Sequence, residues 1–175
     1  YWLKSFADLV LYTGIQKRSA VFISTPLTHG FGYTSLVFAL IMGKKAVVSA
    51  EHNPAVLASL ICEEKTDLLT GVPSSLYQLS KTLAGKDHPV RLIISGGAPL
   101  NEKILAELSN TLSKNLFSFY GSTEVSTSFM ASYNELQQEV HALGRPLTGI
   151  QYKLEKINGG AEELWIKSPL SNVSP

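Results

Sequence analysis

The chain has 175 residues, of which 45% are hydrophobic and 17% are charged, a balance typical of a globular protein with a buried core. Its formal net charge is +1, and it contains no dense run of lysine and arginine, so its charge gives no reason to expect nucleic acid or an anionic membrane as a partner. The longest apolar run, 36–42, is far too short to span a membrane and predicts a buried helix instead.

The single cysteine, Cys62, cannot form a disulfide within the chain and has no partner residue at metal-binding spacing. This favours a reducing compartment, the cytoplasm, and a side chain that fills the core. The chain starts at Tyr1 instead of methionine and stops at Pro175 in a stretch rich in serine and proline, so we expect it to be a piece of a longer protein.

Predicted strands and helices alternate along the first 120 residues. Residues 2–15 carry apolar side chains at helical spacing that end at Gly14, which predicts an opening amphipathic helix. Short apolar runs, each a predicted strand, follow at 20–24, 46–49, 67–70, 91–95 and 116–120. The predicted helices between them are the apolar segment 30–42, a helix that begins at Asn53-Pro54, one from Pro73 to Gly85, and one over 104–112. Because strands separated by helices make βαβ units, we expect an α/β fold with a largely parallel sheet of about five strands, right-handed crossovers and flanking helices.

After residue 140 the pattern changes. Tyr152 and Leu154 alternate with polar residues, Asn158-Gly-Gly160 is a turn signal, and the apolar run 164–166 follows it. This predicts an antiparallel hairpin. We therefore expect residues 1–138 to form an α/β subdomain and residues 139–175 to begin a β-rich subdomain.

The stretch Phe119-Tyr120-Gly121-Ser122-Thr123-Glu124, which follows the fifth predicted strand, combines residue types that suit a nucleotide phosphate site. An aromatic face can stack on a purine, and a glycine lets backbone amides approach an anion. A hydroxyl can donate to a phosphate oxygen, and a carboxylate can bind Mg²⁺. Taken alone, these residues favour the alternative interpretation, a strand that ends in a polar turn.

The position of other polar segments favours the nucleotide site. Ligands of an open parallel sheet bind outside the carboxyl ends of its strands. The first, fourth and fifth predicted strands deliver Thr25–His29, Ser95–Pro99 and Tyr120–Glu124 to that edge. We expect these three segments to meet.

Six motifs together resemble the superfamily of adenylate-forming enzymes, which contains acyl-CoA synthetases, adenylation domains of peptide synthetases and luciferases. They occur in the family's order and span nearly the whole chain. The motifs are Pro26-Leu-Thr-His29, Leu40–Gly43, Thr70-Gly-Val-Pro73, Ser95-Gly-Gly-Ala-Pro99, Tyr120-Gly-Ser-Thr-Glu124 and Leu143-Gly-Arg-Pro146.

The resemblance implies an ATP-dependent ligase that activates a carboxylic acid as an acyl adenylate and then transfers the acyl group to a thiol. It implies that Tyr120 stacks on adenine, that Thr123 bonds the α-phosphate as a catalytic residue, and that Glu124, also catalytic, coordinates Mg²⁺. Further implied nucleotide-binding residues flank these three: Gly96, Gly97, Ala98, Pro99, Phe119, Gly121 and Ser122.

His29 and Gly30 are implied to lie at the acyl-substrate pocket. The alternatives are that His29 starts a helix and bonds nearby backbone, and that Gly30 and Gly32 permit close helix packing. Amino-acid-activating members carry an aspartate after the histidine, whereas no acidic residue lies between His29 and Gly43. The implied substrate is therefore a fatty or aryl acid more than an amino acid. The acceptor is coenzyme A or a carrier-protein pantetheine, with coenzyme A favoured.

One residue departs from the family pattern, and other family motifs fall outside the sequence. Ser118 stands where members often carry asparagine, which implies a smaller polar contact near the nucleotide. The family's phosphate loop would precede Tyr1, and its hinge and catalytic lysine would follow Pro175, so we expect the chain alone to be inactive.

Two readings of other classes compete with the ligase. The first is a catalytically inert nucleotide-binding or regulatory module of the same fold. The second is a receiver-like signalling domain, which needs an aspartate at the end of a central strand. Asp67 begins its predicted strand instead, which disfavours the receiver.

Overall fold

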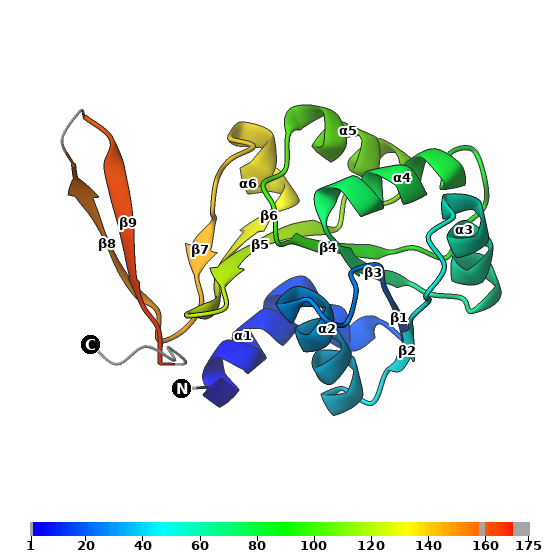
Figure 1. The fold of residues 1–175 in the computed structure, drawn as a ribbon, viewed down its shortest axis with the longest axis horizontal. Helices are drawn as coiled ribbons and strands as arrows, with labels where there is room; N and C mark the ends of the chain where they lie inside the picture. Colours follow the sequence, from blue (N-terminus) through cyan, green and yellow to red (C-terminus); the bar gives the residue numbers. More distant parts are fainter. Residues whose placement is uncertain (1, 158–159, 170–175) are drawn as a thin grey trace.

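A computed structural model describes residues 2–157 and 160–169 of the chain (Figure 1). The helices of these residues are α1 (Trp2–Thr13), the short 3-10 helix η1 (Ile15–Lys17), α2 (Gly30–Ile41), α3 (Pro54–Glu63), α4 (Pro73–Leu83), α5 (Glu102–Thr111) and α6 (Tyr133–Gln138). The strands are β1 (Ala20–Ile23), β2 (Lys45–Val47), β3 (Leu68–Gly71), β4 (Leu92–Gly96), β5 (Leu116–Ser122), β6 (Ser126–Ser132), β7 (Arg145–Pro146), β8 (Gln151–Lys156) and β9 (Glu162–Lys167).

Seven strands form one sheet in the order β2-β1-β3-β4-β5-β6-β7. The five predicted strands pair in parallel, and β6 and β7 extend the sheet by antiparallel pairing. The predicted α/β fold with a largely parallel sheet is confirmed. The chain leaves β1 toward β2 and returns on the other side to β3, so the direction of winding switches between β1 and β3.

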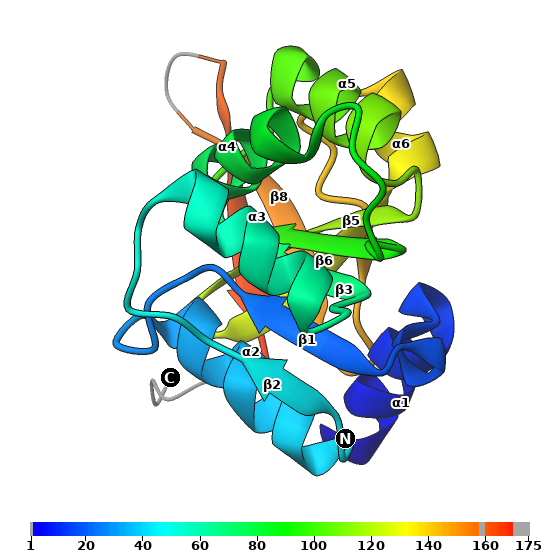
Figure 2. The same cartoon turned by 90° about the vertical axis from the view of Figure 1, so that its right-hand side faces the viewer.

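Helices cover both faces of this sheet, and each face has its own apolar core (Figures 1 and 2). The core under α3, α4 and α5 contains Phe22, Leu69, Ile93 and Leu116. Strand neighbours of these residues point to the opposite face, where α1 and α2 pack. Because both faces are covered, β1, β3 and β4 are buried along their whole length.

Local sequence signals set the ends of several elements. The Asn53 side chain caps α3 by accepting a hydrogen bond from the Ala55 amide at 2.9 Å, with Pro54 in the first turn. At the start of β3, the Asp67 carboxylate accepts hydrogen bonds from the backbone amides of Ser19 and Ala20. Asp67 therefore joins β1 to β3 at the amino edge of the sheet, away from the edge where ligands bind.

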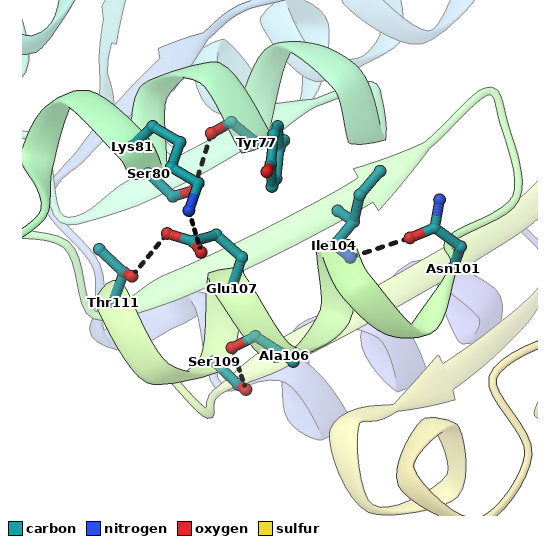
Figure 3. A network of polar contacts seen from close by, with 9 residues as sticks. All are labelled: Tyr77, Ser80, Lys81, Asn101, Ile104, Ala106, Glu107, Ser109 and Thr111. Carbon is teal, nitrogen blue, oxygen red and sulfur yellow. Dashed lines mark hydrogen bonds and ion pairs between the residues drawn. The ribbon is translucent and has the colours of Figure 1, made fainter.

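Helices α4 and α5 are joined on their exposed sides (Figure 3). Lys81 on α4 makes an ion pair of 2.7 Å with Glu107 on α5, and Thr111 donates to the same carboxylate at 3.0 Å. The hydrogen bond from Lys81, followed by the one from Thr111, holds the pKa of Glu107 below its usual range. Asn101 caps α5 through a 2.9 Å bond from the Ile104 amide, which fixes the end of the segment that follows β4.

Two expectations about these elements are wrong, and two elements were not predicted. The apolar end of α2 is not buried, because Leu40 and Ile41 are 63% and 52% exposed. The strand β6 and the helix α6 had no predicted counterpart. The stretch from Phe119 to Ser122 does not follow a strand, since it forms the second half of β5 and pairs with β6.

Strands β8 and β9 pair with each other as a separate antiparallel sheet, which confirms the predicted hairpin. Two of its predicted turn residues, Asn158 and Gly159, lie outside the described residues. The two sheets touch through an edge-to-face contact between Phe129 on β6 and Tyr152 on β8, with ring centroids 5.3 Å apart. The subdomain boundary at residue 138 stays a prediction.

Within the described ranges, 2–157 and 160–169, no helix combines the length and the apolar character needed to cross a bilayer.

Candidate active site

Two of the predicted site segments are neighbours in the sheet. Gly96 at the end of β4 lies opposite Phe119 on β5 in parallel register. After Gly96 the chain turns at Gly97, whose φ of +79° favours glycine, and continues through Ala98 and Pro99 toward α5. The register therefore places this turn beside the Tyr120–Thr123 stretch.

A cleft of about 310 Å³, the Pro99 cleft, lies between these two segments. One wall is the Gly97–Leu100 turn, the second is the Ser118–Gly121 part of β5, and the third is the segment 140–143 that follows α6. Its size falls at the lower end of small-molecule sites. Ser118, the predicted departure from the family, lies in this wall.

A second cleft of about 440 Å³, the His29 cleft, shares part of that wall. It is lined by the start of α2, by Gly97 and by both strands of the β5–β6 hairpin, including Ser122 and Thr123. Gly97, Phe119, Tyr120 and Gly121 line both clefts. The two hollows therefore meet along the Phe119–Gly121 stretch.

His29 and Gly30 open onto the second cleft. His29 precedes the first residue of α2, and its imidazole makes no capping hydrogen bond, while its backbone amide donates to Pro26 O at 2.9 Å. A methyl group built on Gly30 would meet no atom within 4 Å, whereas one on Gly32 would lie 2.4 Å from Pro26 O. Close packing therefore explains Gly32 and does not explain Gly30.

Gly121 permits the hairpin that carries the site. The register between β5 and β6 shifts at Tyr120 and Gly121, which marks a bulge. A Cβ atom on Gly121 would lie 2.1 Å from Ser126 O, so no larger residue fits without movement of the backbone. Ser126 itself has a φ of +60°, unusual for a residue other than glycine. This close approach of the two strands places Ser122 and Thr123 in the lining of the His29 cleft.

The Tyr120 ring is positioned by one neighbour and stays accessible. Its residue is 43% exposed, and the ring meets Phe129 edge to face at a centroid distance of 6.1 Å. Phe129 is buried and in turn contacts Tyr152. The Tyr120 ring therefore packs against Phe129 on one side, and Tyr120 lines both clefts.

Glu124 lies in the turn between β5 and β6, exposed and next to Thr123. A hydrogen bond from the Ser122 hydroxyl, and then one from the backbone of Glu124 itself, hold the pKa of the Glu124 carboxyl below its usual range. The carboxylate is therefore ionised at neutral pH. Among the described residues, no three His, Cys, Asp or Glu side chains cluster as a metal site, so a cation bound by Glu124 would need its other ligands from phosphate and water.

The structure brings most, but not all, predicted site residues to the two clefts. Those that line one or both are His29, Gly30, Gly97, Ala98, Pro99, Phe119, Tyr120, Gly121, Ser122 and Thr123. Gly96 lines neither, because the Phe31 ring covers it: a Cβ on Gly96 would lie 2.9 Å from two ring atoms. Glu124 stands beside the His29 cleft in the hairpin turn. The binding and catalytic roles of all these residues stay predictions.

Sequence reasoning missed several residues of the clefts. The segment 140–143 closes the Pro99 cleft and includes His141, a residue whose spacing to other histidines or acidic residues indicated no site. The motif Leu143–Pro146 was the available signal. Gly144 has a φ of +75°, and a Cβ on it would lie 2.1 Å from Met130 O, so this glycine lets the segment pass close to β6.

A larger cleft, of about 700 Å³, contains only one of the predicted segments. This Ser75 cleft lies at the carboxyl ends of β1 and β2, between α3 and α4. Its floor is apolar, and Ser24 and Ser75 are hydrogen-bonded to each other in its wall at 2.8 Å. Residues Thr25–Leu27 line it, while His29 faces the other cleft. The residues of the Phe119–Glu124 stretch do not border it, so we place the candidate site in the two smaller clefts.

Comparison with known proteins agrees with this geometry. The uncharacterized acyl-CoA ligase YhfT of Bacillus subtilis is 24% identical over 97% of this chain, and the match covers 36% of that protein. The putative long chain fatty acid-CoA ligase VraA of Staphylococcus epidermidis is 28% identical over 74% of this chain, and 28% of that protein is covered. The chain thus spans about a third of the length of these relatives.

The fold matches that of a solved enzyme. The O-succinylbenzoate coenzyme A synthetase MenE of Bacillus subtilis, determined in complex with ATP and magnesium, superposes with a TM-score of 0.80 at 23% identity, over 95% of this chain and 36% of that one. The family model described as AMP-binding enzyme matches residues 3–174. The chain therefore belongs to the AMP-binding enzyme family, in which its relatives are acyl-CoA ligases.

Proposed function

We propose that this chain is the nucleotide-binding part of an acid–thiol ligase that activates a carboxylic acid as its acyl adenylate. The observation that carries the proposal is the shared wall of the two clefts at Phe119–Gly121. A nucleoside in the Pro99 cleft and an acid in the His29 cleft would meet at this wall. Their reacting atoms, the α-phosphorus and the carboxylate oxygen, would then lie beside Gly121 and Thr123.

Different residues around the Phe119–Gly121 wall bind different parts of the nucleotide in this proposal. The Tyr120 ring stacks on the adenine, and the Gly97–Pro99 turn forms the opposite side of its pocket. The Thr123 hydroxyl donates to the α-phosphate, and Gly121 lets backbone amides approach the same oxygens. Holding the two reactants in this arrangement supplies much of the catalysis in transfer reactions of phosphates.

Glu124 fits a role as a magnesium ligand. Its carboxylate is exposed and stays ionised because its pKa is low, and Mg²⁺ in nucleotide sites takes one or two carboxylates together with phosphate oxygens and water. When bound, the ion neutralises charge that develops on the phosphates. Thr123 and Glu124 are adjacent in one turn, so the same hairpin presents both groups.

The proposed reaction has two steps. A carboxylate oxygen of the acid attacks the α-phosphorus of ATP, the bond from that phosphorus to the bridging oxygen breaks, and pyrophosphate leaves. A thiol sulfur then attacks the acyl carbon, loses its proton and displaces AMP.

For the acid, we propose a fatty or aryl carboxylate. None of the residues that line the His29 cleft is acidic, so the cleft offers no partner for the ammonium group of an amino acid. The names of the relatives VraA and MenE refer to a fatty acid and to an aryl acid.

For the thiol, we propose coenzyme A, with a carrier-protein pantetheine as the alternative. The thiol must reach the acyl carbon from a side that the nucleotide and the acid do not occupy. The Ser75 cleft lies at the same edge of the sheet, and Leu27, which lines it, is two residues before His29 of the other cleft. Its apolar floor and paired hydroxyls suit an arm that has methylene and amide groups. The cytoplasmic location predicted from the single cysteine stays a prediction.

We also propose that the isolated chain does not complete adenylation. None of the residues that line the Pro99 and His29 clefts is lysine or arginine, although the departing pyrophosphate carries several negative charges that a cationic side chain would stabilise. The chain spans about a third of its relatives, so such a side chain can come from elsewhere in a longer protein.

ATP–pyrophosphate exchange tests both parts of the proposal. We expect exchange that depends on an added fatty or aryl acid with the full-length protein, and AMP binding without exchange for residues 1–175. Exchange by the isolated chain would refute the division of labour. AMP binding without exchange by the full-length protein, with every acid in a broad panel, would identify the protein as an inert nucleotide-binding module.

A further inference from the structure

The charged side chains are divided unequally between the two edges of the seven-stranded sheet. We call the amino edge the five segments that run from the end of a helix to the first residue of the parallel strand that follows: residues 14–20, 42–45, 64–68, 84–92 and 112–116. Eight of the 15 lysines and arginines of the chain lie in these segments, but only three of its 14 acidic residues. The amino edge therefore carries a net charge of +5 and the rest of the chain −4, although the net charge of the whole chain is only +1.

Backbone hydrogen bonds place these segments side by side. The amide of Lys45 donates to Ser19 O at 3.2 Å, which joins the starts of β2 and β1. The amide of Arg91 donates to Asp67 O at 2.9 Å, which joins the starts of β4 and β3. Because neighbouring strands lie about 4.8 Å apart, the starts of the five parallel strands form a row roughly 20 Å long.

Most cations of the amino edge face solvent and have no acidic partner. Lys45 makes an ion pair with Glu64, and the carboxylate of Asp67 is occupied by two backbone amides. Five other cations are exposed and make no ion pair with any residue in the described part of the chain: Lys17, Lys65, Lys86, Arg91 and Lys114. The positive charge of this edge is therefore available to a partner.

Helix stability explains only part of this arrangement. The C-terminus of a helix carries a partial negative charge, which favours a cation close to the last turn. Lys65 and Lys114 directly follow α3 and α5 and fit this explanation. Arg91 does not, because it lies far beyond the end of α4 and directly before β4.

The amino edge suits a flat anionic surface better than a nucleic acid. None of its residues is aromatic, so it offers no ring on which a base could stack. Helices end at this edge and do not begin there, so it presents no helix N-terminus whose amides could bind a phosphate. A row of separate lysines attracts a plane of negative charge without any shaped pocket.

The position of this edge leaves the candidate active site free. The Pro99, His29 and Ser75 clefts are all formed by segments that follow the carboxyl ends of the strands, whereas the amino edge is at the other end of the same strands. A surface bound there would leave the three clefts open to water, from which nucleotides enter.

From these observations we infer that the amino edge is a docking surface for a membrane that contains anionic lipids. Attraction between the exposed cations and the lipid headgroups supplies the binding, and no part of the chain needs to enter the bilayer. The inference goes beyond the proposed ligase function and does not depend on it. For a ligase that uses fatty acids, docking would keep the protein close to the bilayer in which such acids dissolve.

Sedimentation of the full-length protein with vesicles tests this inference. The vesicles contain phosphatidylcholine alone, or phosphatidylcholine with about one-third phosphatidylglycerol. We expect the wild type to bind the anionic vesicles at least about tenfold more strongly at about 50 mM salt, and to lose most of this preference at about 200 mM salt because the charges are screened. The triple variant Lys17→Gln/Lys65→Gln/Lys114→Gln should bind them about fivefold more weakly for each lysine, or roughly 100-fold in total.

The matched control removes the same charge from other parts of the chain. Lys103→Gln/Lys156→Gln/Lys167→Gln should bind anionic vesicles within about threefold of the wild type. Equal losses in the two triple variants, or a wild type that does not prefer the anionic vesicles, would refute the assignment of the amino edge. Release of the wild type from these vesicles by an equal charge concentration of DNA of about 30 base pairs would make nucleic acid the partner and overturn the inference as well.

Two further measurements separate docking from folding and from catalysis. Thermal melting checks that each variant folds. If the first triple variant does not fold, its three single substitutions decide, since each should weaken vesicle binding by about fivefold. ATP–pyrophosphate exchange without vesicles should be the same in both triple variants as in the wild type, so a failure of the ligase function would be distinct from a failure of docking.

Discussion

Replacing Tyr120 with alanine should weaken AMP binding while the protein stays folded. Stacking of a base on an aromatic side chain contributes about 1–3 kcal/mol. Because Tyr120 is 43% exposed, part of the ring faces solvent, and we expect the lower part of this range, about 1–2 kcal/mol, or a rise in Kd of about 5- to 30-fold. Tyr120→Phe should bind AMP within about twofold of the wild type because it keeps the ring.

Tyr152→Ala is the matched control for this experiment. Tyr120 and Tyr152 both meet Phe129 edge to face, at centroid distances of 6.1 and 5.3 Å, and both are about half exposed. Each substitution therefore removes a similar ring contact, worth about 0.5–1.5 kcal/mol of stability, but Tyr152 borders neither of the two clefts. Calorimetric titration of the full-length variants with AMP gives Kd, and thermal melting checks the fold. An equal loss of affinity in both variants, or no loss in Tyr120→Ala, would refute the stacking role.

Three further predictions concern the hairpin and the Ser75 cleft. Gly121→Ala should destabilise the protein by about 1–3 kcal/mol and impair AMP binding, since its Cβ would lie 2.1 Å from Ser126 O; denaturant titration should show no comparable loss of stability for Gly30→Ala, which has open space. Ser122→Ala should raise the pKa of Glu124 toward its ordinary value, because the hydrogen bond from Ser122 is the main cause that lowers it, so that the carboxylate protonates at a higher pH on acidification. Side-chain NMR titration measures this change in pKa, and an unchanged Glu124 pKa would contradict the prediction. Glu51 is the internal reference, because backbone hydrogen bonds lower its pKa and the substitution does not affect them. Gln78 is an exposed residue that lines the Ser75 cleft. Gln78→Trp should narrow this cleft, slow thioester formation and leave adenylate formation unchanged, whereas Gln78→Ala should affect neither reaction. If Gln78→Trp slows both half-reactions equally, the cleft is not the route of the thiol.

The sequence predicted the strands that are buried on both faces of the sheet. Helices cover β1, β3 and β4 on both faces, so each strand is an uninterrupted apolar run in the sequence. Such a run predicts a buried strand even when the strands that pair with it are not known. The cap formed by Asn53 was also predicted, because its side chain bonds the amide of Ala55, only two residues away. The convergence of the site segments followed from a rule of parallel sheets, and Gly97 and Thr123 do border one cleft.

The elements that the sequence did not predict depend on distant partners. Strand β6 has the sequence Ser-Thr-Ser-Phe-Met-Ala-Ser, whose small polar residues carry no strand signal, and it is buried because it pairs with β5 and lies beneath helices. The opposite error occurred in α2, where Leu40 and Ile41 are apolar yet exposed.

The parallel ladder between β4 and β5 has a consequence for how the protein loses its binding properties. The same row of paired residues runs from Ile93 and Leu116 in the apolar interior to Gly96 and Phe119 at the clefts. A shift of one residue in this pairing would turn every β5 side chain to the other face, so the Phe119–Gly121 stretch cannot rearrange while the apolar interior stays intact. On heating, we therefore expect AMP binding to be lost in the same cooperative transition in which the whole sheet unfolds, and not at a lower temperature.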